Sequence, residues 1–112
     1  MKWDALVKLG CELPEVEEAT WYRTPSLKVR GKGFVRLKED GESVVFLLES
    51  LEEQEALLEA RSDIYFLTDH YRGYRAILAR LSKLRTTEAR VRLEHAWRTK
   101  APKTLIRNWD QR

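Results

Sequence analysis

The chain has 112 residues, of which 43% are hydrophobic and 35% are charged, and its formal net charge is +3. This length suits one domain spanning residues 1–112, and the composition is that of a solvated globular protein and not of a disordered segment. No apolar run approaches the roughly 18 residues of a membrane span, and no long apolar region follows Met1, as it would in a signal peptide. Cys11 is the only cysteine, which excludes an internal disulfide and a cysteine metal cluster. We therefore expect a cytoplasmic protein without membrane contact.

The charge is distributed unevenly along the chain. Residues 1–82 contain 12 basic and 15 acidic side chains, a balance of −3, whereas residues 83–112 contain 9 basic and 3 acidic ones, a balance of +6. A basic C-terminal third can attract nucleic acid or another polyanion. A solvated helix face is the alternative explanation.

The first segment predicts a short helix over Lys2–Leu9, with Asp4 as a candidate cap and Gly10 as its end. A buried thiol is the commoner situation for a lone cysteine such as Cys11, although a helix end could also lower its pKa. Residues 15–18, which include three glutamates, are expected to form an acidic connection.

Strands are predicted over residues 19–48. The segment Trp21–Thr24 is aromatic and polar, and Pro25 ends it or moves it to a sheet edge. Around the glycines at 31 and 33, a two-residue turn would place Lys28 opposite Val35. A three-residue loop would instead pair Val29 with Val35, and we favour it because it keeps the apolar residues together.

The alternation in these strands predicts two unequal faces. The core face is expected to hold Leu27, Val29, Val35, Leu37, Val44 and Phe46. The other face is expected to hold Lys28, Arg30, Phe34, Arg36, Val45 and Leu47. Since this second set mixes basic and apolar side chains, we expect another part of the molecule to lie against some of it.

The second half predicts two long helices and two further strands. Ser50 and Glu53 form a capping box, which starts a helix that runs to about Arg61. Strands are expected over residues 64–67 and 74–81. Thr86 or Thr87 is expected to cap the last long helix, which reaches Lys100.

The end of the chain is predicted to return to the protein body. Trp97 shares an apolar stripe with Leu93 and Ala96, so it is expected in the core. Pro102 disfavours helical geometry at the preceding residue. Residues 104–109 are then expected to form a final turn that packs on the body.

Several blocks along the chain stand out together by their order and spacing. They are Leu13-Pro14, the run from Thr24 to Phe34, Thr68, His70-Tyr71, Gly73-Tyr74, Leu78 to Leu81, Ala96-Trp97-Arg98 and Ala101-Pro102-Lys103. In these blocks the chain resembles the MmcQ/YjbR-like family, also described as double-wing DNA-binding proteins. The chain differs from many such relatives at Arg75, where they have proline, and at Arg23, where they have glycine. The resemblance implies an α+β domain with a mainly antiparallel sheet, helices packed against it and hairpins as wings. It implies no known reaction.

The expected wing hairpin supplies the candidate nucleic-acid site. Its residues are Lys28, Arg30, Lys32, Phe34 and Arg36. Cations there would neutralise phosphates, and the phenylalanine could stack on bases. The alternative is a solvated edge on which lysines discourage pairing between sheets.

A second candidate site surrounds the loop with His70, Tyr71 and Tyr74. An imidazole titrates near neutral pH, and the two phenols could orient a ligand. The alternative is that the tyrosines anchor the loop to the sheet. Arg98 and Lys103 are further candidates for interaction, although cations near a helix C-terminus also suit its dipole.

No catalytic signature is present, and we expect neither an enzyme nor a resident metal or cofactor. We expect weak, salt-dependent DNA binding. The alternative is a protein- or small-ligand-interaction domain that uses the groove between the Phe34/Arg36 face and the His70 loop. Contiguous positive charge across the hairpin and the C-terminal helix would favour DNA, whereas a concave pocket lined by tyrosine and arginine would favour a ligand.

Overall fold

The computed structural model describes residues 1–112 and contains a six-stranded antiparallel sheet in the order β1-β2-β3-β4-β6-β5. The strands are β1 Val16–Trp21, β2 Thr24–Val29, β3 Lys32–Leu37, β4 Ser43–Leu47, β5 Tyr65–Phe66 and β6 Ala76–Arg80. The first four form a meander, and the chain then returns so that β6 pairs with β4. The predicted α+β class with a mainly antiparallel sheet is confirmed.

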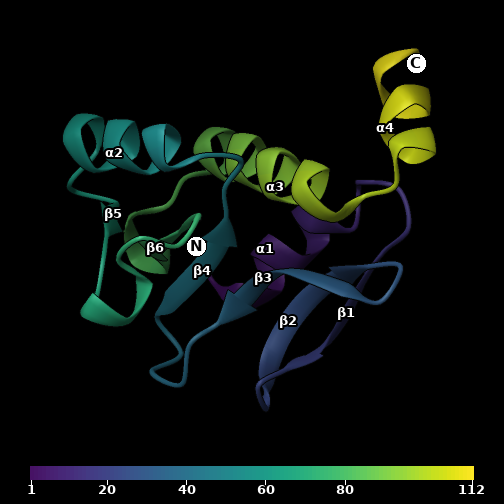
Figure 1. The fold of residues 1–112 in the computed structure, drawn as a ribbon. Coiled ribbons are helices and arrows are strands. Elements are labelled where there is room, and N and C mark those ends of the chain that lie inside the picture. The colour runs from purple at the N-terminus through teal and green to yellow at the C-terminus, as the bar shows by residue number, and fades with distance from the viewer.

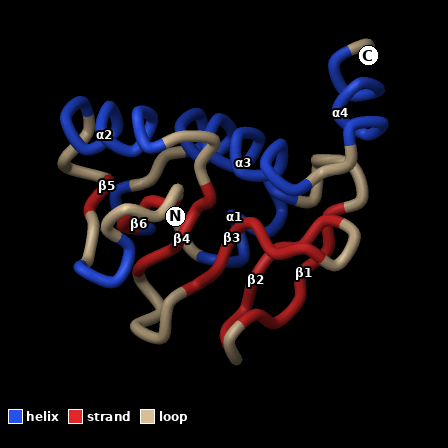
Figure 2. The backbone as a smooth tube through the Cα atoms, in the orientation of Figure 1, coloured by secondary structure: helices blue, strands red, loops and turns tan.

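The helices gather on one side of the sheet, as Figures 1 and 2 show. They are α1 Trp3–Gly10, α2 Leu51–Ala60, α3 Thr86–Lys100 and α4 Lys103–Asp110, with short 3-10 helices η1 at Asp69–Tyr71 and η2 at Leu81–Lys83. Helix α3 packs on β3 and β4 and also against α1, while α2 lies beside β5 and β6. The opposite side of the sheet, called the open face below, carries no helix longer than η1.

The main core lies between the sheet and these helices. Strand alternation sends Leu27 and Phe46 toward the helices, and both are fully buried. Trp97 of α3 has no exposed surface, and its indole N–H donates a hydrogen bond of 3.1 Å to the Pro14 carbonyl. The predicted core position of Trp97 is therefore confirmed.

The first hairpin, β1–β2, was not predicted from the sequence. Strand β1 already begins at Val16, so the acidic residues 17 and 18 are part of a strand and not of a connection. The turn consists of Tyr22 and Arg23, whose φ angles are 54° and 67°. These values suit a type I′ turn, which needs positive φ at both central residues. Pro25 lies inside β2, opposite Thr20 of the edge strand β1.

The second hairpin contradicts both registers considered from the sequence. Its two-residue turn is Arg30-Gly31, with φ angles of 47° and 80°, so that Val29 pairs with Lys32. The register then shifts, and Leu27 pairs with Val35. The extra residue on β3 is Phe34, and the bulge turns its ring into the core. Phe34 was expected on the other face and is instead fully buried.

The helix ends agree with the sequence only in part. The Ser50 hydroxyl accepts a hydrogen bond of 3.1 Å from the Glu53 backbone, which confirms one half of the predicted capping box. The Glu53 carboxylate does not reach back and is instead bonded to Arg92 and His95. Arg85 precedes α3 without a side-chain cap, so the threonine cap predicted there is wrong. Residue Asp4 lies in the first turn of α1 and does not cap it. Cys11 is exposed and not buried; partial desolvation and then Glu18 raise the pKa of its thiol.

The C-terminal segment forms a complete helix and not a single turn. Helix α3 ends at Lys100, and α4 begins directly after Pro102 and projects from the body (Figure 1). Leu105 is buried against the core, and the Trp109 ring lies edge-on to Trp97 at 6.0 Å between centroids. The expected return of this segment to the body is confirmed for these two side chains.

Candidate binding groove on the open face of the sheet

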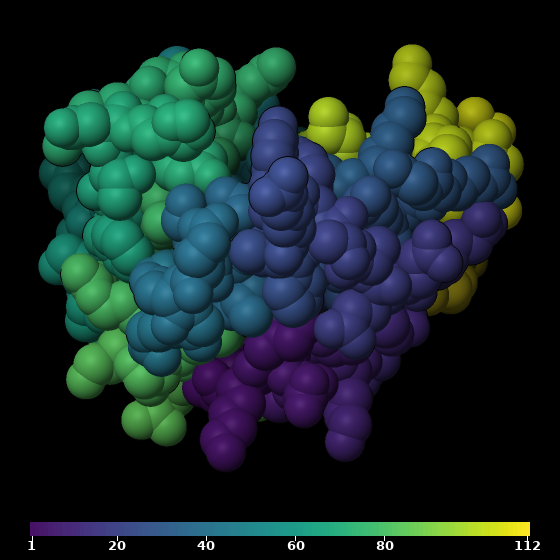
Figure 3. Space-filling model, turned by 90° about the horizontal axis from the view of Figure 1, so that it is seen from below, coloured from purple at the N-terminus to yellow at the C-terminus, as the bar shows by residue number.

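The open face contains a groove of about 670 Å³. Its floor follows from strand alternation, because Arg36, Val45 and Leu47 point away from the core side chains Val44 and Phe46. The full lining is Trp21, Tyr22, Arg36, Glu39, Val45, Leu47, His70, Tyr71, Tyr74, Arg75 and Ala76. We call this the aromatic groove. In the view from below, the indigo β1–β2 turn and the green segment around η1 stand on either side of a hollow (Figure 3).

One wall of the groove is the β1–β2 turn. The rings of Trp21 and Tyr22 stack at 5.6 Å between centroids with 26° between their planes. Tyr22 is 73% exposed, so one ring of this pair is open to solvent. The Trp21 ring lies directly on Gly33, where an added Cβ would come within 2.5 Å of Trp21 Cε3. Because residue 33 has no side chain, the Trp21 ring can lie against the backbone of β3.

The opposite wall is the segment around η1. The His70 ring meets Tyr71 edge-on at 4.8 Å and stacks with Tyr74 at 6.2 Å, with 20° between those planes. The buried amide of Gln54 donates hydrogen bonds of 2.7 and 2.8 Å to the backbone oxygens of Tyr74 and Ala76. Helix α2 thus positions this wall through Gln54, a residue that the sequence reasoning missed because nothing local marks it.

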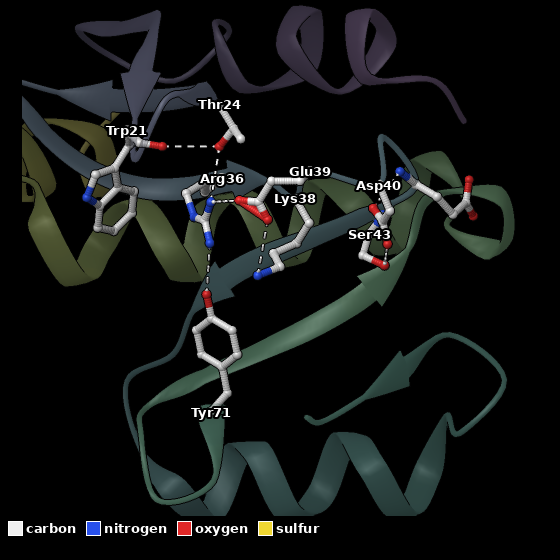
Figure 4. Close-up of polar contacts among 9 residues, drawn as sticks. Trp21, Thr24, Arg36, Lys38, Glu39, Asp40, Ser43 and Tyr71 are labelled. Atoms are coloured by element: carbon white, nitrogen blue, oxygen red, sulfur yellow. Dashed lines mark hydrogen bonds and ion pairs between the residues drawn. The ribbon is translucent and has the colours of Figure 1, made fainter. Parts of the chain in front are cut away.

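Arg36 joins the two walls from the floor, as Figure 4 shows. Its guanidinium donates to Thr24 Oγ1 at 3.2 Å, to Glu39 Oε1 at 3.0 Å and to the Tyr71 hydroxyl at 3.2 Å. It also lies 5.3 Å from the centroid of the Tyr22 ring. Burial by itself would lower the pKa of Arg36, but the hydrogen bonds with Tyr71 and Glu39 raise it overall. The groove therefore holds a buried guanidinium that is fixed in place and paired with the Glu39 carboxylate.

A second hollow of about 540 Å³ adjoins the aromatic groove and shares Trp21 and Leu47 with it. Its cations are Lys28 of β2, Lys32 of β3 and Lys100 at the end of α3, and it contains no carboxylate. We call it the lysine hollow. Residues of the β2–β3 hairpin and of α3 thus meet at one surface, although they are far apart in the sequence.

A third hollow, of about 440 Å³, continues the same surface past Leu47. Arg75 lines both this hollow and the aromatic groove, and Lys100 lines both this hollow and the lysine hollow. No carboxylate lies within 4.0 Å of the charged groups of Lys28, Lys32, Arg75 or Lys100. The three adjoining hollows therefore combine exposed aromatic rings with four cations that form no ion pair, and the third hollow also contains the carboxylate of Glu49.

The structure separates the five residues predicted for nucleic acid. Lys28 and Lys32 meet in the lysine hollow. Arg30 instead forms an ion pair of 2.7 Å with Glu15. The ring of Phe34 is in the core, where it cannot stack on a base, and Arg36 is only 7% exposed.

The predicted interaction residues separate as well. His70, Tyr71 and Tyr74 come together in the aromatic groove. Arg98 lines the third hollow but is bonded to Glu94 and Asp110, and these contacts raise its pKa. Lys103 begins α4, is exposed and lines none of the three hollows.

Other arginines of α3 are also neutralised. Arg90 pairs with Glu12 of the segment after α1, and Arg92 pairs with Glu53 of α2 at 3.1 Å. No group of three or more His, Cys, Asp or Glu side chains could hold a metal ion. None of the helices has the length and apolar character needed to cross a membrane.

The family comparison agrees with the fold. Residues 11–99 match the family model described as YjbR. The chain belongs to the YjbR family, as its sequence blocks suggested. The matched range includes the sheet, the aromatic groove and α3 up to Thr99, while α4 lies outside it.

Curated relatives match a shorter segment. Proteins of Mycobacterium tuberculosis strain H37Rv, "Uncharacterized protein Rv2570", and of Mycobacterium bovis, "Uncharacterized protein Mb2600", are each 35% identical to this chain over 51 residues. The match covers 46% of this chain and 40% of each relative. The chain is thus matched to less than half of their length, and their names describe no activity.

Proposed function

We propose that this member of the YjbR family is a binding module for nucleic acid, without catalytic activity, and that it binds through the open face of its sheet. The observation that carries the proposal is the adjacency of the aromatic groove and the lysine hollow. Unneutralised cations attract phosphates, and exposed aromatic rings stack on bases. A cytoplasmic location is part of this proposal.

The proposed surface differs from the hairpin surface expected from the sequence. Arg30 already has Glu15 as its partner, and Arg36 is held by Thr24, Glu39 and Tyr71. Releasing either guanidinium to a phosphate would cost these bonds. Lys28, Lys32 and Lys100 have no such bonds to lose, so they support phosphate contact better.

The small number of free cations supports weak binding. Each phosphate contact contributes about 0.7 to 0.9 to the slope of log K against log salt. Three lysines and one arginine would therefore give a slope of about 3 to 4. Nucleic acid bound in this way is readily displaced by added salt.

A fluorescein-labelled DNA with a duplex part and a single-stranded overhang tests this proposal by fluorescence anisotropy. Replacing Lys28, Lys32 and Lys100 with alanine is expected to weaken binding and to lower the salt slope by about 2 to 3. A matched control replaces Lys2, Lys8 and Lys83, which are exposed and line neither the aromatic groove nor the lysine hollow. Equal loss in both triple variants, or no binding by the wild type, would contradict the proposal.

A second candidate function is the binding of a small aromatic ligand in the aromatic groove. Its support is the pair of exposed rings, Tyr22 and Tyr74, on opposite walls of the groove. The groove volume lies within the range of about 300–1,000 Å³ that small-molecule sites occupy. This ligand would not need the lysine hollow, so the lysine triple variant separates the two functions.

A further inference from the structure

We infer that the open face takes a single strand of nucleic acid and not a duplex. This inference rests on the proposed function and specifies its ligand. Three features lead to it: the accessibility of the aromatic rings, the apolar floor between them and the occupation of α3 by other contacts.

The rings of the aromatic groove are open to a flat partner. Tyr22 is 73% exposed and Tyr74 is 63% exposed, and they belong to opposite walls. Exposed apolar groups that gather in one patch often mark a binding site, and these rings gather in one groove. An unpaired base can place a ring face against them, whereas the ring faces in a duplex are covered by neighbouring base pairs.

The floor also suits a base. Val45, Leu47 and Ala76 give it an apolar surface, and the Arg36 guanidinium, paired with Glu39, is fixed at one side. Hydrophobic and aromatic lining with a few fixed polar groups is the usual composition of a small-molecule site. A base that is still paired in a duplex could not reach this floor.

The free cations define a path for the backbone of such a strand. Arg75 stands where the aromatic groove meets the third hollow, and Lys100 stands where that hollow meets the lysine hollow. Lys28 and Lys32 complete the path. Phosphates along these cations would leave the bases on the Trp21 side, next to the aromatic groove.

Duplex recognition would need an element that α3 cannot supply. A recognition helix inserts into the major groove with free polar side chains. Helix α3 instead packs on the sheet, and its arginines 90, 92 and 98 are bound to Glu12, Glu53 and Glu94. The tip of the β2–β3 hairpin likewise has its arginine bound to Glu15.

The test compares labelled oligothymidine and oligouridine of about ten nucleotides with a DNA duplex of the same length, at one salt concentration. The expected result is at least about tenfold tighter binding of a single strand than of the duplex. Oligothymidine and oligouridine distinguish DNA from RNA as the source, and tighter binding of either supports the inference.

A double variant, Tyr22→Ala with Tyr74→Ala, checks the stacking. Its single-strand affinity is expected to fall at least about tenfold, since stacking on one aromatic ring is worth about fivefold or more and two rings are removed. The matched control is Leu51→Ala with Val91→Ala, which removes two exposed apolar side chains outside the groove. Circular dichroism is used to check that both variants fold.

The outcomes separate the inference from the proposed function. Equal or tighter binding of the duplex would overturn the single-strand inference and leave nucleic-acid binding intact. An unchanged single-strand affinity in the tyrosine double variant would overturn it too. Absence of binding to all three probes would overturn the proposed function itself.

Discussion

The Arg36 guanidinium donates a hydrogen bond of 3.2 Å to the Tyr71 hydroxyl, although 35 residues separate the two in the chain. This bond connects strand β3 to the segment around η1 on the open face of the sheet. Together with the bond from Arg36 to Thr24 Oγ1, it fixes both walls of the aromatic groove to one side chain. The groove is therefore formed before any ligand arrives.

Tyr71→Phe removes the acceptor from this buried charge. Loss of a hydrogen bond to a charged group should lower the free energy of unfolding by about 1.5–3 kcal/mol, which urea denaturation measures. Tyr74→Phe is the matched control, because Tyr74 is exposed and its hydroxyl accepts no hydrogen bond from Arg36. If the two variants have the same stability, the Arg36–Tyr71 bond contributes nothing.

Gly33→Ala should disturb the aromatic groove without replacing any residue that lines it. The new Cβ would lie 2.5 Å from Trp21 Cε3, so the indole must move. The Trp21 indole resonance in NMR spectra is expected to shift. Gly31→Ala is the contrast: its Cβ meets nothing, and its φ of +80° costs about 1–2 kcal/mol of strain. An unmoved Trp21 indole resonance in Gly33→Ala would show that the ring does not depend on this glycine.

Trp97→Ala should lower the free energy of unfolding by about 3–5 kcal/mol, because the indole is fully buried and bonded to the Pro14 carbonyl. Trp109→Ala, in the partly exposed α4, is expected to cost less. The urea midpoints of the two variants make the comparison. A Trp97→Ala midpoint at the wild-type value would contradict the packing of α3.

Acid should destabilise the β3–β4 connection through Asp40. The backbone N–H groups of Ser43 and Glu42 donate to its carboxylate at 2.8 and 2.9 Å and hold its pKa below the usual value. Because the folded pKa is the lower one, this stability is complete above the unfolded pKa of about 3.9 and is lost as pH falls through the folded pKa. When the free energy of unfolding is plotted against pH, Asp40→Asn should therefore show a flatter acid limb than the wild type. A variant curve that runs parallel to the wild-type curve would contradict this.

The sequence predicted the fold class, the main helices and the position of Trp97, because each depends on a pattern repeated over many residues. It did not predict the turns at Tyr22-Arg23 and Arg30-Gly31. Three of these four residues are not glycine and still have positive φ, which local propensity disfavours. The resulting bulge moved Phe34 into the core, and this one-residue shift changed the predicted site.

The composition of the candidate site could be predicted only in part. His70, Tyr71 and Tyr74 are neighbours in the sequence, so their grouping was apparent. The meeting of Lys28 and Lys100 depends on how α3 ends beside the hairpin, and no local pattern specifies that. The neutralisation of Arg30 by Glu15 is equally a product of the tertiary fold, since it joins the β1 entrance to the β2–β3 turn.

Backbone amide NMR shifts during titration with oligothymidine test the central claim most directly. We predict that the shifted resonances lie on the open face, at Lys28, Gly33, Leu47, residues 70–76 and Lys100. Resonances of α2 and of the exposed side of α3 around Arg90 should stay in place. Shifts that centre on Arg90, or spectra that do not change at all, would contradict binding through the open face of the sheet.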